Sequence, residues 1–321
     1  MNKIYQISAG GIVLMSTILS STTEAGVIPK DALTIANSVL ALKVNGHPRA
    51  IVVISKNDVK HVTYTISPAL PSGTQISPAD CGDMKGEDKC VLTISPGPFP
   101  SALPGTVAQP SLITISGENG NKVMAEISVL TYGSLYQQGY VFALYDDLNK
   151  YPSVRSIGGT IASLQNNHPS IAWGNGTFIH TKATSLSNGW ENTRLIKIAQ
   201  GDSQYAASIC AHYQIDKHGN SPCKESVCYS EWYVPSVCQL GSVNKGIGCL
   251  GMPTQPNMEE NLFRLNPSIG SLAGYHWSST EYENDPLKTA WIQFFDGNHS
   301  AERFIVSKES ISAIRCVRDI V

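Results

Sequence analysis

Short hydrophobic runs alternate with turn residues through the first part of the chain. Six runs rich in β-branched residues lie at 39–44, 50–55, 61–66, 90–95, 112–116 and 122–130. Turn signals stand between them, among them Asn45-Gly46 and Asn119-Gly120. Many short strands separated by such turns are typical of an antiparallel sandwich. The pattern therefore predicts an all-β sandwich domain over residues 26–132.

The pattern changes near residue 136, where longer irregular segments with more Trp, Tyr and Cys begin. Tyr205, Ile209 and Tyr213 are spaced four residues apart, which predicts a helix over 202–214. We expect further helices after Pro235 and over 258–265, and strands at 140–144, 290–295 and 311–317. This order predicts a loop-rich α+β domain over residues 136–321.

Residues 1–25 have the composition of a secretory signal peptide. Lys3 gives a positive start, an apolar run covers residues 9–19, and Ala25 is a small residue at the expected cleavage site. The run is shorter than the roughly 20 apolar residues of a membrane span, and no later segment is apolar enough for one. We therefore expect an exported protein without an integral membrane segment. Periplasm, cell surface and medium stay open as its destination.

The cysteines agree with export. Eight are present: Cys81, Cys90, Cys210, Cys223, Cys228, Cys238, Cys249 and Cys316. An even number in an exported chain predicts disulfides, and the spacing lacks the paired C-x-x-C of a zinc site. Cys81 and Cys90 bracket a polar loop, which predicts a local bridge between them.

Charge and motifs limit the classes of function. With 23 basic and 25 acidic residues the net charge is -2, so the chain has no basic footprint for nucleic acid. It contains no G-x-S-x-G, H-E-x-x-H or P-loop motif. We therefore expect a binding protein and not an enzyme.

Four motifs in the second half carry a family resemblance. They are EWYVPS at 231–236, YHWSSTEY at 275–282, AWIQFFDG at 290–297 and IRCVR at 314–318. In this order they resemble the Lcl C-terminal domain family, which is named for a bacterial collagen-like adhesin. In the first half, IVVISKNDVKHVTYTI and C…C-VLTISPG resemble a bacterial immunoglobulin-like repeat. Such repeats serve as spacers or adhesive platforms.

The Lcl resemblance implies a C-type-lectin-like fold, related to formylglycine-generating enzymes, over residues 136–321. That fold ties an early helix to the last strand by a disulfide, which Cys210 and Cys316 match. Local pairs Cys223–Cys228 and Cys238–Cys249 then use up the remaining cysteines. Other pairings of these six cysteines stay open.

The resemblance also implies a ligand, either a glycan or a surface protein. The candidate ligand-binding residues are His276, Trp277, Glu281, Tyr282, Arg303, Arg315 and Arg318. A sulfated polymer requires a local basic cluster, for which Arg303, Lys308, Arg315 and Arg318 are the candidates; the alternative is a scatter of solvated charges. The family's Gly-X-Y tract is missing, and the part from Leu135 onward has 14 basic and 16 acidic residues, which puts trimerisation and sulfated ligands in doubt. The oligomeric state is open.

Alternatives remain for each functional assignment. The tryptophan motifs suit structural anchors in a loop-rich domain, and the chain then is an envelope protein without a small ligand. A thiol-dependent enzyme related to formylglycine-generating enzymes requires a free reactive cysteine. No cofactor is expected, although Glu281, Glu283 and Asp285 offer alternating carboxylates for calcium.

Overall fold

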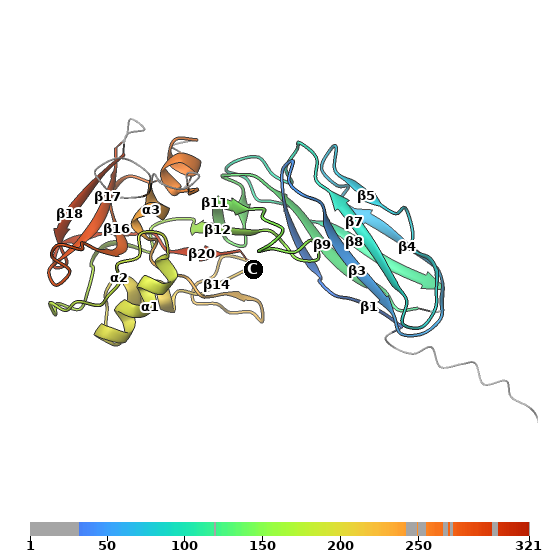
Figure 1. Cartoon of the computed structure of the whole chain (residues 1–321), viewed down its shortest axis with the longest axis horizontal. Helices are drawn as coiled ribbons and strands as arrows, with labels where there is room; N and C mark the ends of the chain where they lie inside the picture. The colour runs from blue at the N-terminus through green and yellow to red at the C-terminus, as the bar shows by residue number, and fades with distance from the viewer. Residues whose placement is uncertain are drawn as a thin grey trace, which may run out of the picture.

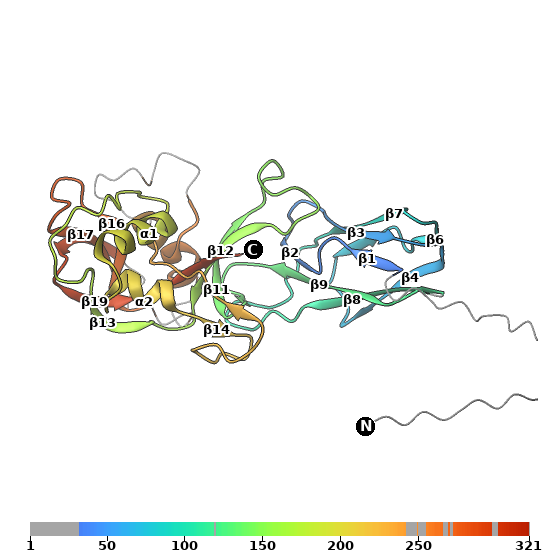
Figure 2. The ribbon, with the colours of Figure 1, turned by 90° about the horizontal axis from the view of Figure 1, so that it is seen from below.

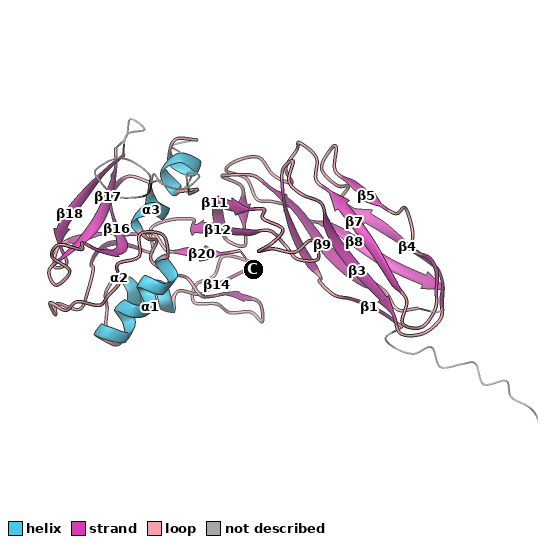
Figure 3. Cartoon of the chain, viewed as in Figure 1, coloured by secondary structure: helices cyan, strands magenta, loops and turns pink. Residues whose placement is uncertain are grey.

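The computed structural model describes residues 32–118, 120–241, 249, 255–265, 269, 272–296 and 301–320. The expected signal peptide lies outside these residues. The described chain is mostly β, with several sheets and few helices (Figure 3). It forms two lobes along one long axis (Figures 1 and 2). We call residues 32–130 the N-lobe and residues 135–320 the C-lobe. No helix in the described ranges is both long and apolar enough to cross a bilayer.

Two sheets build the N-lobe. The strand order of the first is β1 (Leu33–Ile35), β3 (Arg49–Ser55), β7 (Lys89–Ser95), β5 (Gln75–Ser77). That of the second is β2 (Val39–Lys43), β9 (Val123–Leu130), β8 (Ser111–Glu118), β4 (Val59–Ser67), β6 (Gly82–Met84). The six hydrophobic runs of the sequence correspond to β2, β3, β4, β7, β8 and β9. The short strands β1, β5 and β6 were not predicted.

One aliphatic core joins the two sheets of the N-lobe. Ile51 and Val53 of β3 are buried, as are Ile113 and Ile115 of β8, and the residue between each pair is more exposed. Successive side chains of a strand point to opposite faces, so this alternation gives each sheet one buried face.

The C-lobe contains two larger sheets and a small hairpin. One sheet has the order β10 (Leu135–Tyr136), β11 (Gly139–Tyr145), β12 (Gly158–Ser163), β20 (Val317–Asp319). The other has the order β13 (His168–Ala172), β19 (Ile311–Ile314), β16 (Gly274–Glu281), β17 (Thr289–Phe295), β18 (Ala301–Ser307). The hairpin pairs β14 (Ile215–Asp216) with β15 (Cys228–Tyr229). The single strand predicted at 311–317 is therefore two strands in different sheets, because the chain crosses between the sheets at Arg315 and Cys316.

The helices of the C-lobe are short. They are α1 (Gly189–Gln200), α2 (Ala206–His212), α3 (Val237–Leu240) and a π-helical turn, η2 (Glu259–Phe263). The last three lie inside the predicted helical segments, whereas α1 was not predicted. Its buried residues are Gly189, Asn192, Thr193, Ile196 and Gln200. With one aliphatic side chain on that face, α1 has no apolar stripe that a helical pattern would reveal.

Four disulfides link all eight cysteines. The pairs are Cys81–Cys90, Cys210–Cys316, Cys223–Cys228 and Cys238–Cys249, which are the four expected pairs. The Cys210–Cys316 bridge spans 106 residues and ties α2 to the segment between β19 and β20. Disulfides are typical of proteins that leave the reducing cytosol.

A buried arginine fastens the two lobes together. Arg49 of β3 is fully buried and donates to the carboxylate of Asp146 and to the carbonyl oxygens of Tyr151 and Pro152. Ala41 of the N-lobe also belongs to the core cluster of the C-lobe. Either lobe produced without the other would expose the surface at which the two lobes are in contact.

Candidate functional site

Two of the expected ligand-binding residues lie in the core of the C-lobe. His276 and Trp277, on β16, are both 0% exposed. The Trp277 indole N–H donates to the carbonyl oxygen of Ile171 at 2.8 Å. Burial, with a contribution from the Arg315 charge, lowers the pKa of His276 to about 4, so its ring is neutral. Both side chains support the sheet and do not face solvent.

Glu281, at the end of β16, is also buried. Its Oε1 lies 2.5 Å from Nζ of Lys308 and accepts hydrogen bonds from the backbone N–H and the hydroxyl of Thr181. The half-exposed His180 approaches the other oxygen, with Nε2 at 3.5 Å from Oε2. Lys308 also lies over the ring of Trp173. Both members of the pair are thus committed to internal contacts.

Arg303 and Arg315 are buried as well. Arg303 donates to the carbonyl oxygen of Gly241, and Arg315 donates to that of Ser163 at 2.7 Å. Burial lowers the pKa of each guanidinium to about 10, which leaves both charged at neutral pH. With Lys308 also buried, these cations form no common surface, contrary to the expected basic cluster.

The remaining two residues reach the surface at different places. Tyr282 follows β16 and packs edge-on against Trp291. Arg318 of β20 is half-buried and borders a groove of about 220 Å³. The lining residues of this groove are Trp190, Glu231, Tyr233, Arg318 and Asp319. We call it the Trp190 groove.

The start of helix α1 places Trp190 at this groove. The helix begins against the segment that follows Tyr233, because a Cβ on Gly189 would lie 2.5 Å from both the carbonyl oxygen of Val234 and Oε1 of Gln239. Only glycine allows this approach. Trp190 comes next and is 50% exposed. A half-exposed tryptophan presents a large flat apolar surface to solvent.

The opposite wall comes from two segments far apart in sequence. Tyr233 and Val317 exchange backbone hydrogen bonds in an antiparallel bridge, both at 2.8 Å. Antiparallel pairing brings Glu231, two residues before the bridge, toward Asp319, two residues after it. Burial, together with the neighbouring Asp319 carboxylate, raises the pKa of Tyr233 well above its ordinary value. The phenol stays protonated and donates to Oδ1 of Asp319 at 2.6 Å.

Arg318 is held by hydrogen bonds to two other segments of the C-lobe. Its Nε donates to the carbonyl oxygen of Ser230, and Nη1 donates to Oε1 of Gln137, both at 2.8 Å. The guanidinium also lies over the ring of Tyr229, 5.4 Å from its centroid. Burial lowers the pKa of Arg318, while the Glu231 charge opposes this change. Arg318 is therefore fixed in position as one wall of the groove.

Unusual backbone conformations gather around Arg318. Gln137, Gln138 and Glu231 have φ angles of 48°, 64° and 64°, in the left-handed region that non-glycine residues rarely adopt. Gln137 accepts the hydrogen bond from Arg318, and Gln138 donates to the carbonyl oxygen of Lys217. Strained residues of this kind cluster at functional sites.

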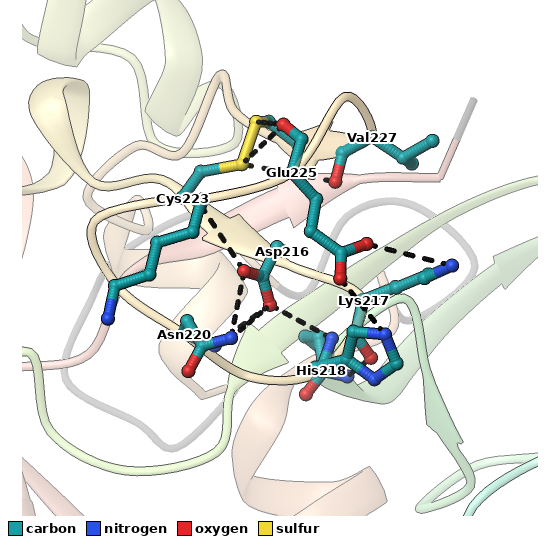
Figure 4. Close-up of polar contacts among 10 residues, drawn as sticks. Asp216, Lys217, His218, Asn220, Cys223, Glu225 and Val227 are labelled. Carbon is teal, nitrogen blue, oxygen red and sulfur yellow. Dashed lines mark hydrogen bonds and ion pairs between the residues drawn. A yellow bond between two sulfur atoms is a disulfide. The ribbon is translucent and has the colours of Figure 1, made fainter.

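A loop that contains the Cys223–Cys228 disulfide joins β14 to β15, the strand that carries Tyr229 (Figure 4). Asp216 lies at its centre and accepts hydrogen bonds from the backbone N–H groups of His218, Asn220 and Lys224. Burial raises the pKa of Asp216, but these bonds and the Asn220 amide outweigh it and lower the pKa to about 2. The carboxylate therefore holds the loop in one shape at neutral pH, and β15 supplies the tyrosine beneath Arg318.

A second hollow, of about 350 Å³, lies between α2 and the turn at Ser221 and Pro222. Its lining consists of hydroxyl and amide side chains, His212, and an apolar part formed by Ile209, Tyr213 and Pro222. It contains neither a tryptophan nor a carboxylate. The Trp190 groove combines a half-exposed tryptophan with charged groups of both signs, so we take it as the candidate site.

The chemistry of the Trp190 groove is that of binding. Trp190 offers a flat face for stacking, and the carboxylates of Glu231 and Asp319 offer hydrogen-bond acceptors. No signal in the sequence singled out Trp190 or Glu231 as partners of Arg318. Among the described residues, no three His, Cys, Asp or Glu side chains gather as a metal site, and Glu281 of the expected calcium set is paired with Lys308.

Comparison with family models and with curated proteins finds no match. Among solved structures, the chain is similar to WR4, a C. elegans member of the MSP family, with TM-score 0.24, 10% identity, and 31% of this chain and 99% of that chain covered. It is also similar to the periplasmic chaperone SfaE, with TM-score 0.26, 8% identity, and coverage of 33% and 61%. The E. coli chaperone DraB gives TM-score 0.26, 12% identity, and coverage of 46% and 74%. Such low TM-scores support no argument about function.

Proposed function

We propose that this protein is an exported glycan-binding adhesin whose binding site is the Trp190 groove of the C-lobe. The observation that carries the proposal is a half-exposed tryptophan beside a hollow with two carboxylates and a fixed guanidinium. A sugar ring presents an apolar face and a rim of hydroxyl groups. The indole can stack on the face, and the charged side chains can bond the hydroxyls.

Two further observations support binding over catalysis. All eight cysteines are in disulfides, so the oxidised chain offers no thiol for chemistry of the formylglycine-generating type. The groove is also built on rigid supports, namely a helix start, a β-bridge and a disulfide-closed loop. Preorganised side chains bind with a smaller entropic loss. The resemblance to the Lcl C-terminal domain family suggests the same class of function.

In this proposal the N-lobe is an immunoglobulin-like platform that carries the C-lobe. The buried Arg49–Asp146 contact and the shared core keep the two lobes in contact. The ligand is a glycan of the envelope or of a surface that the bacterium meets. The alternative is a structural envelope protein without a small ligand.

A glycan array with the oxidised whole chain tests the proposal. We expect binding that Trp190→Ala weakens by at least about tenfold, since a buried tryptophan contact is often worth more than 1.4 kcal/mol. Phe178→Ala is the matched control, because Phe178 is 46% exposed and lies outside the groove. If the folded chain binds no glycan, or if both variants lose binding equally, the groove is not a glycan site and the structural role gains support.

A further inference from the structure

The charges of the Trp190 groove are unevenly presented to solvent. One guanidinium and two carboxylates line it, so the lining carries an excess of one negative charge. Glu231 and Asp319 are exposed, whereas Arg318 is half-buried. Two of the three Arg318 nitrogens already donate hydrogen bonds within the protein, to Ser230 and Gln137. A ligand that enters the groove therefore meets carboxylates first.

Groups around the Trp190 groove add to the negative charge of its lining. The charge of Glu126 contributes to a raised pKa for Tyr136 and for Tyr229, behind burial as the main cause, so a third carboxylate acts on the tyrosine whose ring lies against Arg318. Lys308, Arg303 and Arg315 are buried elsewhere in the C-lobe and contribute no cation to the lining. A sulfated or otherwise anionic polymer would be repelled here.

Trp190 favours a ligand of the opposite sign. The face of an indole ring attracts cations as well as apolar surfaces, and the attraction is strongest for tryptophan. The half-exposed Trp190 and the two exposed carboxylates therefore all favour a cationic ligand. Amines on a sugar ring take up a proton near neutral pH and then carry the charge next to the apolar ring face.

We propose that the Trp190 groove binds an amino sugar with a free ammonium group, such as a unit of a glucosamine polymer. The ring face packs on Trp190, and the ammonium group donates hydrogen bonds to Glu231 and Asp319. This inference rests on the proposed function and names its ligand class. It differs from the expectation of a sulfated ligand, since three of the four cations behind that expectation, Arg303, Lys308 and Arg315, are buried.

Calorimetric titration with three probes tests the inference on the oxidised whole chain. The probes are a short glucosamine oligomer, the N-acetylated oligomer of the same length, and a sulfated polysaccharide. We expect the free amine to bind about three- to tenfold more tightly than the N-acetylated form, a range typical of partly solvated ion pairs. Added salt should reduce that difference, and the sulfated polymer should not bind.

Variants then assign the preference to the groove. Glu231→Gln should lower the affinity for the free amine by about two- to fivefold, since Asp319 remains. Glu283→Gln, at an exposed carboxylate outside the groove, is the control and should leave the affinity unchanged. Unchanged thermal transitions of both variants establish that the fold is intact.

The outcomes separate the two proposals. Equal binding of the amine and the N-acetylated form, or a preference that Glu231→Gln leaves intact, overturns the ligand assignment and keeps the groove as a glycan site. Binding of a different array glycan that depends on Trp190 does the same. If no glycan binding depends on Trp190, the proposed function fails as well.

Discussion

The two lobes of this protein are stabilised by different kinds of interior. The N-lobe has an aliphatic core between two sheets and one local disulfide. The C-lobe adds to its apolar clusters buried tryptophans, an ion pair, two arginines and a histidine, and has three disulfides. A core of the first kind depends on surface removed from water, and one of the second kind depends on specific partners. Specific partners also fix side chains in position, which a binding site requires.

The disulfides give the largest expected difference between the lobes. In the chain-entropy model, Cys210→Ala with Cys316→Ala lowers the free energy of unfolding by about 4.7 kcal/mol, because the bridge closes a loop of about 100 residues. Cys81→Ala with Cys90→Ala, which opens a short loop of the N-lobe, should cost about 2.5 kcal/mol. Urea denaturation of both double variants measures the difference. Equal losses would show that loop length does not govern the contribution.

The buried ion pair comes next. Glu281→Gln leaves the Lys308 ammonium buried without its counter-charge, which should cost about 3 to 5 kcal/mol. Glu191→Gln removes the carboxylate of an exposed pair with Arg194 on α1 and is the matched control, with no measurable change expected. Thermal denaturation compares them. Similar small losses of stability in both variants would mean that the buried Glu281–Lys308 pair contributes no more to stability than the exposed pair.

The buried histidine predicts a dependence on pH. His276 has a pKa of about 4 in the folded protein and 6.5 as its ordinary value. The unfolded chain therefore takes up a proton between pH 6.5 and 4 while the folded chain does not, so stability falls as pH is lowered through this window. The loss reaches about 3 kcal/mol at pH 4. Denaturation of the wild type and His276→Gln across the window measures it, and parallel curves would contradict the prediction.

The smallest expected effect concerns backbone conformation. Glu231→Gly and His61→Gly replace residues with φ of 64° and 49° in the C-lobe and the N-lobe. Each should gain roughly 1 kcal/mol from relief of the left-handed conformation. Only the first should weaken glycan binding. Loss of binding in both would indicate an effect on the whole fold and not on the groove.

The difference between the interiors of the two lobes also explains which strands the sequence could predict. In the N-lobe, strands such as β3 and β8 alternate buried and exposed residues, so the period-two pattern and the turns between runs were enough. In the C-lobe, β16 has six buried residues in succession, including Ser278, Ser279 and Thr280. Hydrophobic periodicity cannot identify a strand whose buried side chains are hydroxyls with partners elsewhere in the fold.

Residue roles in the C-lobe were harder to predict than its elements. The motifs around Trp277 and Arg315 pointed to a surface, whereas the structure buries both side chains. The Trp190 groove joins Trp190, Glu231 and Asp319, which lie on three separate segments. Their proximity depends on the close approach at Gly189 and on the Tyr233–Val317 bridge. Neither is visible as a local pattern.

The Cys210–Cys316 bridge also has a consequence for biogenesis. Four cysteines lie between its partners in the chain, so under the proposed export Cys210 would reach an oxidising compartment well before Cys316. If neighbouring thiols are oxidised in order of arrival, Cys210 is joined to Cys223, and the short bridge to Cys228 cannot form. The native set is then reached by thiol–disulfide exchange, which takes minutes to hours without a catalyst. Maturation of the C-lobe should therefore depend on a disulfide isomerase, whereas the N-lobe can oxidise unaided.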